Sequence, residues 1–304
     1  MRCLVVGGAG FIGWKLVAEL ARTGRFVRIL DQVPRRPELQ KRISYIKGSM
    51  ENESAISRAM DGCDTVFHLA CAMCPKTSND DPIQDIRSNV LGTLKLLNVC
   101  VASRVHKLIF VSSGGTVYGI PQILPIPEDH PTRPICSYGI SKLAIEKYLH
   151  LYHLLHGLDY SILRLSNAYG EGQDPERGQG AIAAFLWRAI KSRPIEIWGD
   201  GSVIRDYVHV DDIVRALVMV SNETTQDRIF NVGSGRGTSL KEIINLIQRL
   251  VHKKIEVHYK PPRSFDVPAV VLDIQRIQKQ LGWTPQVSLM DGLKRATEWL
   301  KFLS

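Results

Sequence analysis

The chain has 304 residues, 44% of them hydrophobic, and a formal net charge of +9. This length and apolar content suffice for a substantial core and predict two interlocked lobes. The charge suits anionic ligands, but Lys and Arg are spread out rather than clustered among aromatic residues, which argues against nucleic-acid binding.

Strand-like and helix-like patterns alternate along the first half of the chain. Apolar strand patterns lie near 2–6, 26–30, 43–46, 65–69, 107–112 and 160–165, and helical patterns lie near 11–23, 52–60, 83–103 and 137–156. This alternation predicts an α/β fold, a Rossmann-type doubly wound parallel sheet with ligands outside the carboxyl ends of its strands. After about residue 166 come Gly- and Pro-rich loops and a helix near 180–191, which predict a smaller C-terminal substrate lobe.

A glycine-rich turn follows the first predicted strand directly. Gly7, Gly10 and Gly13 leave room for a tight turn, a close pyrophosphate and close helix–strand packing. The helix that begins there presents N–H groups and a positive dipole end to phosphates. Asp31 ends the second strand, where a carboxylate accepts from ribose hydroxyls. Arg35 and its neighbouring arginine suggest a 2′-phosphate site, but Asp31 would repel that phosphate, so we expect NAD rather than NADP.

Tyr138 and Lys142 lie four residues apart in a predicted helix, so they project from one face about one turn apart. A phenol titrates near ~10 and is a poor base at neutral pH. The Lys142 ammonium and a bound cationic nicotinamide would lower the pKa of Tyr138 and favour the phenolate. A phenolate there takes a proton from an alcohol while hydride leaves the alcohol carbon. The spacing alone is common on helix surfaces, so its meaning depends on the turn before it.

Six further motifs follow in a fixed order, at 66–70, 89–93, 111–119, 163–170, 199–212 and 230–235. Together with the glycine-rich turn and the Tyr-x-x-x-Lys pair, they resemble the extended short-chain dehydrogenase/reductase family, and most closely its nucleotide-sugar 4-epimerases. The resemblance covers nearly the whole chain. It implies an NAD-binding Rossmann domain at 1–166, to which 208–233 returns, and a lobe at 167–304 that mostly binds the nucleotide sugar.

The resemblance also implies the site residues. Those expected on NAD are Gly7, Gly10, Phe11, Ile12, Gly13, Asp31, Ser49, Met50, Leu69, Ala70, Asn89, Tyr138 and Lys142. Those expected on a UDP-sugar are Thr116, Asn167, Trp198, Arg205, Arg263, Asp266 and Val270. Arginines suit this task because a planar guanidinium grips phosphate oxygens in pairs. At the position of Ser49 the family commonly has an Asp that meets the adenine amino group; here we expect the Ser49 hydroxyl to accept that bond, with help from the Met50 backbone.

The chain departs from the family at Gly114, where these epimerases carry a Ser or Thr that donates to the reacting sugar hydroxyl. Thr116, two residues on and on the same face of an extended segment, is our first candidate to replace it, and Ser113 is the second. Related 4,6-dehydratases place an Asp-Glu pair at Gly115 and Thr116, and related decarboxylases keep a Glu at the latter. Neither residue here has a carboxyl group, so the sequence favours epimerisation.

Val270 occupies a position that borders the pocket for the sugar C2 substituent in these epimerases. A large aromatic there resembles enzymes restricted to glucose and galactose, while a small residue resembles those that also admit N-acetylated sugars. We therefore expect UDP-GlcNAc and UDP-GalNAc to be accepted. The alternative is that Val270 is a core residue of the apolar run 269–272.

The helices at 83–103 and 137–156 are apolar on more than one face. In the family the equivalent pair forms a four-helix dimer interface, which implies a homodimer. The alternative, packing on the sheet alone, would cover only one face of each helix.

The six cysteines are typical of an intracellular protein, and we expect a cytoplasmic one. Cys71 and Cys74 form a Cys-x-x-Cys pair, but no second pair completes a zinc site, so we expect no metal. No apolar run reaches ~18 residues and the N-terminus enters a strand at once, so we expect neither a membrane span nor a signal peptide.

The leading hypothesis is therefore NAD-dependent inversion of C4 of a UDP-hexose through a transient 4-keto sugar. A second hypothesis is a dehydrogenase or reductase of the same fold that releases its product. A third is a catalytically silent dinucleotide sensor; such proteins usually lose the Tyr or the Lys, and both are present.

Overall fold

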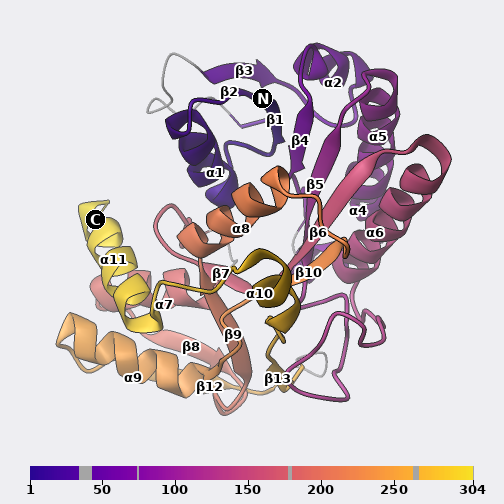
Figure 1. Ribbon diagram of the computed structural model, residues 1–304. Coiled ribbons are helices and arrows are strands. Elements are labelled where there is room, and N and C mark those ends of the chain that lie inside the picture. The colour runs from indigo at the N-terminus through magenta and orange to yellow at the C-terminus, as the bar shows by residue number, and fades with distance from the viewer. Residues whose placement is uncertain (34–42, 74, 177–179, 263–266, 304) are drawn as a thin grey trace. The chain divides into compact units, whose positions relative to one another are not determined.

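A computed structural model describes residues 1–33, 43–73, 75–176, 180–262 and 267–303 (Figure 1). The chain forms two compact units. The first comprises Met1–Gly119, Pro131–Arg164 and Val214–Phe230, and the second comprises Ile120–His130, Leu165–Ile213 and Asn231–Ser304. The predicted functional division at residue 166 stays a prediction.

The first unit is built on a seven-stranded sheet in the order β10-β6-β5-β4-β1-β2-β3. Its strands are β1 (Arg2–Val6), β2 (Phe26–Asp31), β3 (Ile43–Lys47), β4 (Thr65–His68), β5 (Lys107–Ser113), β6 (Asp159–Leu165) and β10 (Ile229–Val232). From β3 through β5 neighbouring strands pair in parallel. Because such strands are buried on both faces, they read as continuous apolar runs, which is why the sequence revealed them. The doubly wound α/β fold is confirmed.

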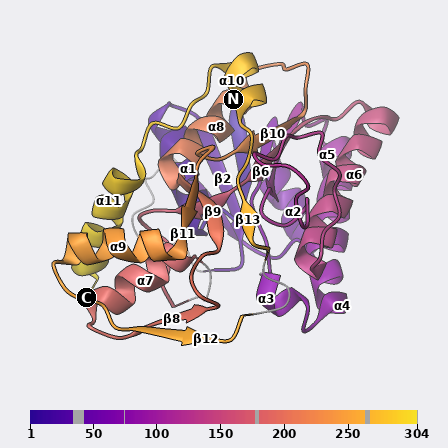
Figure 2. The same cartoon turned by 90° about the horizontal axis from the view of Figure 1, so that it is seen from below.

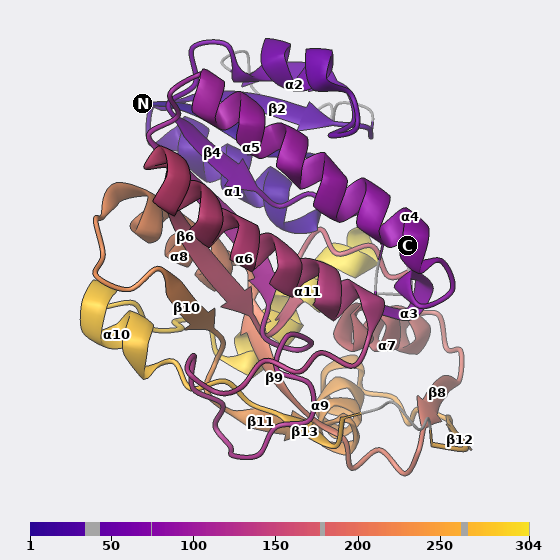
Figure 3. The same ribbon diagram turned by 90° about the vertical axis from the view of Figure 1, so that its right-hand side faces the viewer.

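Helices follow the strands as the alternation predicted. They are α1 (Phe11–Arg22), α2 (Glu53–Met60), α3 (Pro75–Ser78), α4 (Pro82–Asp85), α5 (Gly92–Ala102), α6 (Ser137–His156) and α8 (Val210–Asn222). The helix predicted at 83–103 is α4, a π-helical turn (Ile86–Leu91) and α5 in direct succession. Figure 3 shows α5 and α6 running side by side, and a core cluster of residues from α2, α5, α6 and the strands fills the space beneath them.

The second unit contains a smaller sheet, with β11 (Gly237–Ser239), β9 (Ile204–His209) and β13 (Ala269–Val270) in that order and β7 (Asn167–Tyr169) paired with β9. β8 (Ile195–Trp198) and β12 (Val257–Lys260) form a separate parallel pair. The helices are α7 (Ala181–Ile190), α9 (Leu240–Val251), α10 (Gln275–Leu281) and α11 (Leu289–Phe302). Figure 2 shows α7, α9 and α11 gathered together, around a core that includes Leu186, Ile243 and Leu293. Among the described residues, no helix is long and apolar enough to cross a membrane.

Candidate active site

The glycine-rich turn after β1 is a cradle that side chains would fill. A Cβ on Gly7, whose φ is +85°, would lie 2.6 Å from the Ala70 backbone nitrogen. A Cβ on Gly13 would lie 2.2 Å from the Gly7 carbonyl oxygen. These close approaches require glycine, and they bring the turn against Leu69 and Ala70, which follow β4.

The N-terminus of α1 offers a site for a phosphate group. Gly10 is the N-cap of this helix, makes no side-chain capping bond, and no acidic residue lies in the first turn. The first N–H groups of a helix have no intrahelical acceptor and carry the positive end of the dipole. Phe11 and Ile12 begin the helix, so their N–H groups lie where the sequence predicted a diphosphate. The turn and helix therefore fit a dinucleotide.

Asp31 is the last residue of β2 and is tied to the glycine-rich turn. Its Oδ2 accepts from the Ala9 N–H at 2.9 Å, and its Oδ1 accepts from the Val33 N–H at 3.1 Å. Two backbone donors hold the carboxylate in one orientation beside the turn. This placement is compatible with the predicted contact to ribose hydroxyls, which stays a prediction.

The two residues predicted beside the adenine lie between β3 and α2. The Ser49 hydroxyl accepts from the Glu51 N–H at 3.1 Å and from Gln32 Nε2 at 3.3 Å. The Met50 side chain belongs to the core, where a Cβ on Gly92 would lie 3.0 Å from the Met50 Cβ. Any ligand contact of Met50 would thus involve its backbone.

The Asn89 side chain, in the π-helical turn, bonds at both ends within the protein. Its Oδ1 accepts from the Ala72 N–H at 3.1 Å, and its Nδ2 donates to Asp85 Oδ1 at 2.8 Å. Asn89 thus anchors the segment that follows Leu69 and Ala70. Its predicted direct contact with NAD stays a prediction.

Tyr138 lies in the first turn of α6, and the Ser113 side chain at the end of β5 is one of the groups that influence its pKa. Removal from water raises the pKa of Tyr138 well above its usual value. Asp85 raises it further, while Ser113 lowers it. The lowered pKa that the sequence predicted requires a bound cationic nicotinamide beside Lys142, and it stays a prediction.

Val111 and Ser112, near the end of β5, bond to one face of α6. Lys142 Nζ donates to the Val111 carbonyl oxygen at 2.9 Å and lies 5.6 Å from the Tyr138 ring centroid. The next residue along the strand, Ser112, donates its hydroxyl to Glu146 Oε1 at 2.5 Å. Tyr138, Lys142 and Glu146 are spaced by four, so they project from one side of the helix. The predicted base and ammonium are therefore held on a common backbone edge.

A buried ion pair stabilises Glu146, the residue of α6 that accepts from Ser112. Arg164 Nη2, on β6, lies 2.6 Å from Glu146 Oε2, and the two side chains are only 3% and 2% exposed. Arg164 Nη1 also donates to the Tyr118 hydroxyl at 3.0 Å. The sequence analysis assigned neither charge, although an Arg in an apolar strand and a Glu four residues beyond Lys142 were the available signals.

Thr116 lies in a turn, not in an extended segment. β5 ends at Ser113, and the Thr116 N–H donates back to the Ser113 carbonyl oxygen at 3.3 Å. The same-face argument that first favoured Thr116 was therefore wrong. Its hydroxyl is buried, and no described residue hydrogen-bonds to it. The turn packs closely on α6, since a Cβ on Gly139 would lie 2.9 Å from the Thr116 carbonyl oxygen.

His68, at the end of β4, is buried, and burial lowers its pKa to about 3. Its Nε2 lies 2.8 Å from the Thr93 hydroxyl oxygen. A neutral imidazole bonded inside the core acts as a structural residue.

Apart from Thr116, the described residues predicted to bind the sugar nucleotide lie in the second unit. Arg205, in β9, donates from Nη1 to the Val267 carbonyl oxygen at 2.7 Å and pairs in register with Val270 of β13. Val270 is only 2% exposed. Asn167 begins β7, and Trp198 ends β8 with a 41% exposed side chain. Arg263 and Asp266 lie outside the described residues, as does Cys74.

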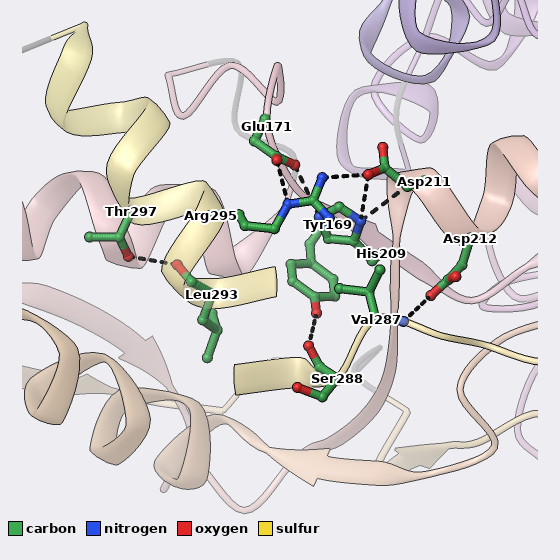
Figure 4. A network of polar contacts seen from close by, with 10 residues as sticks. All are labelled: Tyr169, Glu171, His209, Asp211, Asp212, Val287, Ser288, Leu293, Arg295 and Thr297. Atoms are coloured by element: carbon green, nitrogen blue, oxygen red, sulfur yellow. Dashed lines mark hydrogen bonds and ion pairs between the residues drawn. The ribbon is translucent and has the colours of Figure 1, made fainter. Parts of the chain in front are cut away.

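A polar network in the second unit escaped the sequence analysis (Figure 4). His209 Nδ1 accepts from the Asp211 N–H at 3.2 Å, so its proton is on Nε2, which lies 3.0 Å from Glu171 Oε2. Arg295, on α11, donates from Nε to Glu171 at 2.8 Å and pairs with Asp211. His209 and Asp211 were in a recognised motif but had no assigned role; they join α11 to the ends of β7 and β9. No cluster of His, Cys, Asp or Glu suited to a metal ion occurs within the described ranges.

Comparison with known proteins agrees with this geometry. Residues 3–233 match the family described as "NAD dependent epimerase/dehydratase family". The UDP-glucose 4-epimerase of Mycolicibacterium smegmatis is 37% identical over 309 residues, with 99% of each chain covered. The solved structure of Thermotoga maritima UDP-glucose 4-epimerase with UDP-glucose superposes with a TM-score of 0.96 at 36% identity, covering 100% of this chain and 99% of that one. The dTDP-4-dehydro-6-deoxyglucose reductase of Escherichia coli is 36% identical over 304 residues, covering 96% of this chain and 95% of that one.

Proposed function

We propose that this chain, which belongs to the NAD-dependent epimerase/dehydratase family, inverts C4 of a UDP-hexose with NAD as its cofactor. The observation that carries the proposal is the placement of Lys142 Nζ, which donates to the Val111 carbonyl oxygen of β5, 5.6 Å from the Tyr138 ring centroid on α6. The relatives named as UDP-glucose 4-epimerases support the substrate class. Gly115 and Thr116 provide no carboxyl group for elimination or decarboxylation, so simple return of hydride to the same carbon is the favoured chemistry.

Each residue has a defined task in this proposal. When bound, NAD supplies the hydride acceptor and donor for C4. Tyr138 takes the proton of the C4 hydroxyl and later returns it to the keto oxygen. Ser113, at the end of β5, donates to the reacting hydroxyl in place of the residue missing at Gly114. Lys142, held by the Val111 carbonyl oxygen, provides the positive charge that favours the Tyr138 phenolate once NAD is bound.

The second candidate is reduction of a 4-keto nucleotide sugar. The E. coli reductase favours it, because its identity to this chain matches that of the epimerases. The same tyrosine would then donate a proton to the keto oxygen rather than take one from an alcohol. The two functions differ in whether nicotinamide is consumed.

The test is to incubate the purified protein with UDP-glucose, UDP-galactose, UDP-GlcNAc and UDP-GalNAc, without added cofactor, and to identify products by NMR. An epimerase interconverts a C4 pair with no net change in nicotinamide absorbance. Stoichiometric loss of added NADH with a 4-keto sugar, and no epimer formed from any of the four, would instead establish the reductase.

The hydroxyl that replaces the residue missing at Gly114 is tested by two variants. We expect Ser113→Ala to lower turnover about 10- to 100-fold, because a hydrogen bond to a charged group contributes about 1.5–3 kcal/mol. Thr116→Val keeps the shape of a buried residue whose hydroxyl has no described partner, so we expect less than about a 5-fold loss. Steady-state assays decide the order. If Thr116→Val is the more damaging, the original assignment of Thr116 stands.

The preference for NAD over NADP is tested at Asp31. Asp31→Ala removes a ribose acceptor and the charge that repels a 2′-phosphate, so we expect NAD affinity to fall about 10-fold or more while NADP affinity changes little or rises. Asp31→Asn is the control, since its amide oxygen still accepts from the Ala9 N–H that holds the turn. Both affinities are measured by titration of cofactor-free protein. Equal losses for the two cofactors would contradict the role.

We further propose that N-acetylhexosamines are accepted, because Val270 is small where related enzymes carry an aromatic residue. We expect Val270→Tyr to abolish turnover of UDP-GlcNAc and to retain at least about half of the wild-type turnover of UDP-glucose. The strand position and 2% exposure of Val270 make a packing defect the competing outcome. Parallel loss of both activities, together with a lower melting temperature, would assign Val270 to the core.

We also propose a homodimer formed through α4, α5 and α6. Large apolar side chains on these helices, and Leu91 in the π-helical turn between α4 and α5, face solvent in the single chain. The helical ones include Ile83, Leu151 and Leu155, of which Ile83 is 73% exposed. An apolar surface of this kind is typical of a permanent interface. Light scattering coupled to size exclusion measures the molar mass directly, and a monomer at micromolar concentration would refute the proposal.

We also propose a cytoplasmic location, which the buried free thiols of Cys3, Cys63 and Cys100 support.

A further inference from the structure

Asp85 is a fully buried carboxylate at the end of α4 that the roles above leave unused. No Lys, Arg or His in the described part of the chain lies within ion-pair distance of it. An isolated buried charge is costly unless hydrogen bonds satisfy it. Asp85 accepts three: from Asn89 Nδ2 at 2.8 Å, from the Ser137 hydroxyl at 3.0 Å and from the Ser141 hydroxyl at 2.6 Å.

The two serines stand on either side of Tyr138 in α6. Ser137 and Ser141 are four residues apart, so they face the same way, and both donate to the same oxygen, Asp85 Oδ2. Asp85 thereby clamps the one turn of helix from which Tyr138 projects. Because side chains in a helix follow the backbone direction, holding this turn sets the direction of the phenol.

The segment at the end of α3 supplies the other hydrogen-bond acceptors at the start of α6. The N-cap residue, Cys136, makes no side-chain capping bond. Instead the Tyr138 N–H donates to the Ser78 hydroxyl at 3.0 Å, and the Ser137 N–H donates to Asn79 Oδ1 at 2.9 Å. The helix terminus that carries Tyr138 is thus capped from another segment, with Asp85 as its buried charged centre.

The same carboxylate also reaches the cofactor side of the site. Asn89, whose Nδ2 donates to Asp85, accepts from the Ala72 N–H, two residues beyond Ala70. Ala70 in turn lies against Gly7 of the dinucleotide turn. One buried group therefore links the turn of Tyr138 to the segment after Leu69 and Ala70, two residues expected on NAD.

We propose that Asp85 is a positioning residue, which holds Tyr138 and the segment after β4 in the mutual orientation that concerted proton and hydride transfer requires. This inference rests on the proposed function. A displacement of about 1 Å at the reacting atoms is enough to slow chemistry about 100-fold. A purely structural role would instead reduce the amount of active protein without changing the chemical step.

The test compares Asp85→Ala with Asp85→Asn. The alanine removes all three acceptor contacts, and we expect it to lower kcat about 10- to 100-fold with little change in KM or in bound NAD. The primary isotope effect on a substrate deuterated at C4 should rise, because hydride transfer becomes rate-limiting. Asparagine can bond to Asn89 and both serines, so we expect it to recover kcat to within about 5-fold.

Ser88→Ala is the matched control. Its buried hydroxyl bonds to the backbone carbonyl oxygens of Gln84 at 2.7 Å and Asp85 at 3.5 Å, and not to the Asp85 carboxylate, so kcat and the isotope effect should not change. If Asp85→Ala does not fold, the Ser137→Ala/Ser141→Ala double variant removes two of the three bonds and should show the same rise. The proposal is overturned if the folded Asp85→Ala protein, or that double variant in its place, keeps the wild-type isotope effect.

Failure of the proposed function would look different, because the wild-type protein itself would form no epimer. The same variants would then be compared in reduction of a 4-keto sugar with deuterated NADH, since Tyr138 serves as proton donor in that reaction too. An unchanged isotope effect there would likewise overturn the role of Asp85.

Discussion

Tyr138→Phe is expected to lower turnover at least 100-fold while folding and NAD binding are retained. General acid–base catalysis contributes on the order of 10²–10⁴-fold, and phenylalanine removes the only atom that exchanges the proton. The ring remains, so its contact with Lys142, whose Nζ lies 5.6 Å from the ring centroid, is kept. Epimerisation rates and the content of bound NAD are measured on the same preparation.

Tyr148→Phe provides the matched control for this substitution. Tyr148 lies on the same helix, but its ring is at the surface, so removal of its hydroxyl should change turnover less than about 2-fold. Turnover of Tyr138→Phe within about 10-fold of wild type would show that another group is the base.

Arg164→Met is expected to reduce the free energy of unfolding by about 3–5 kcal/mol, the usual effect of leaving one charge of a buried pair without its partner. Glu146 would keep the Ser112 hydroxyl as a donor but lose the guanidinium 2.6 Å from its Oε2. Because Glu146 follows Lys142 by one helical turn, we expect catalytic activity to fall with stability. Urea denaturation followed by circular dichroism gives the free energy.

Two further variants test the cause. Arg164→Met combined with Glu146→Gln removes both charges while the amide oxygen still accepts from Ser112, so most of the lost stability should return. Arg22→Met breaks the exposed pair with Glu19 on α1 and should leave the unfolding midpoint unchanged. If Arg164→Met lowers the free energy of unfolding no more than the double variant does, the charge left on Glu146 is not the cause of the destabilisation.

Tertiary packing accounts for what the linear pattern missed at the site. Tyr138 and Lys142 were identified from their spacing, yet Thr116 does not continue the strand as expected, because β5 ends at Ser113 and the chain turns there. The pKa of Tyr138 is raised by burial, although its neighbour in the pattern is a cation. Solvent exposure and the ends of strands depend on which distant segments pack together, so the local spacing of residues in the sequence does not reveal them.

The sequence alone predicted the alternating strands and helices and the glycine-rich turn. Burial on both faces of a parallel sheet and the lack of room for a Cβ each restrict consecutive residues, so they leave a pattern that can be recognised locally. It could not identify Asp85 or Arg164 as part of the site. Asp85 meets Ser141 across 56 residues, and Arg164 meets Glu146 across two different elements. A polar residue in an apolar pattern is ambiguous until its partner is known, and that partner is brought to it only when the chain folds.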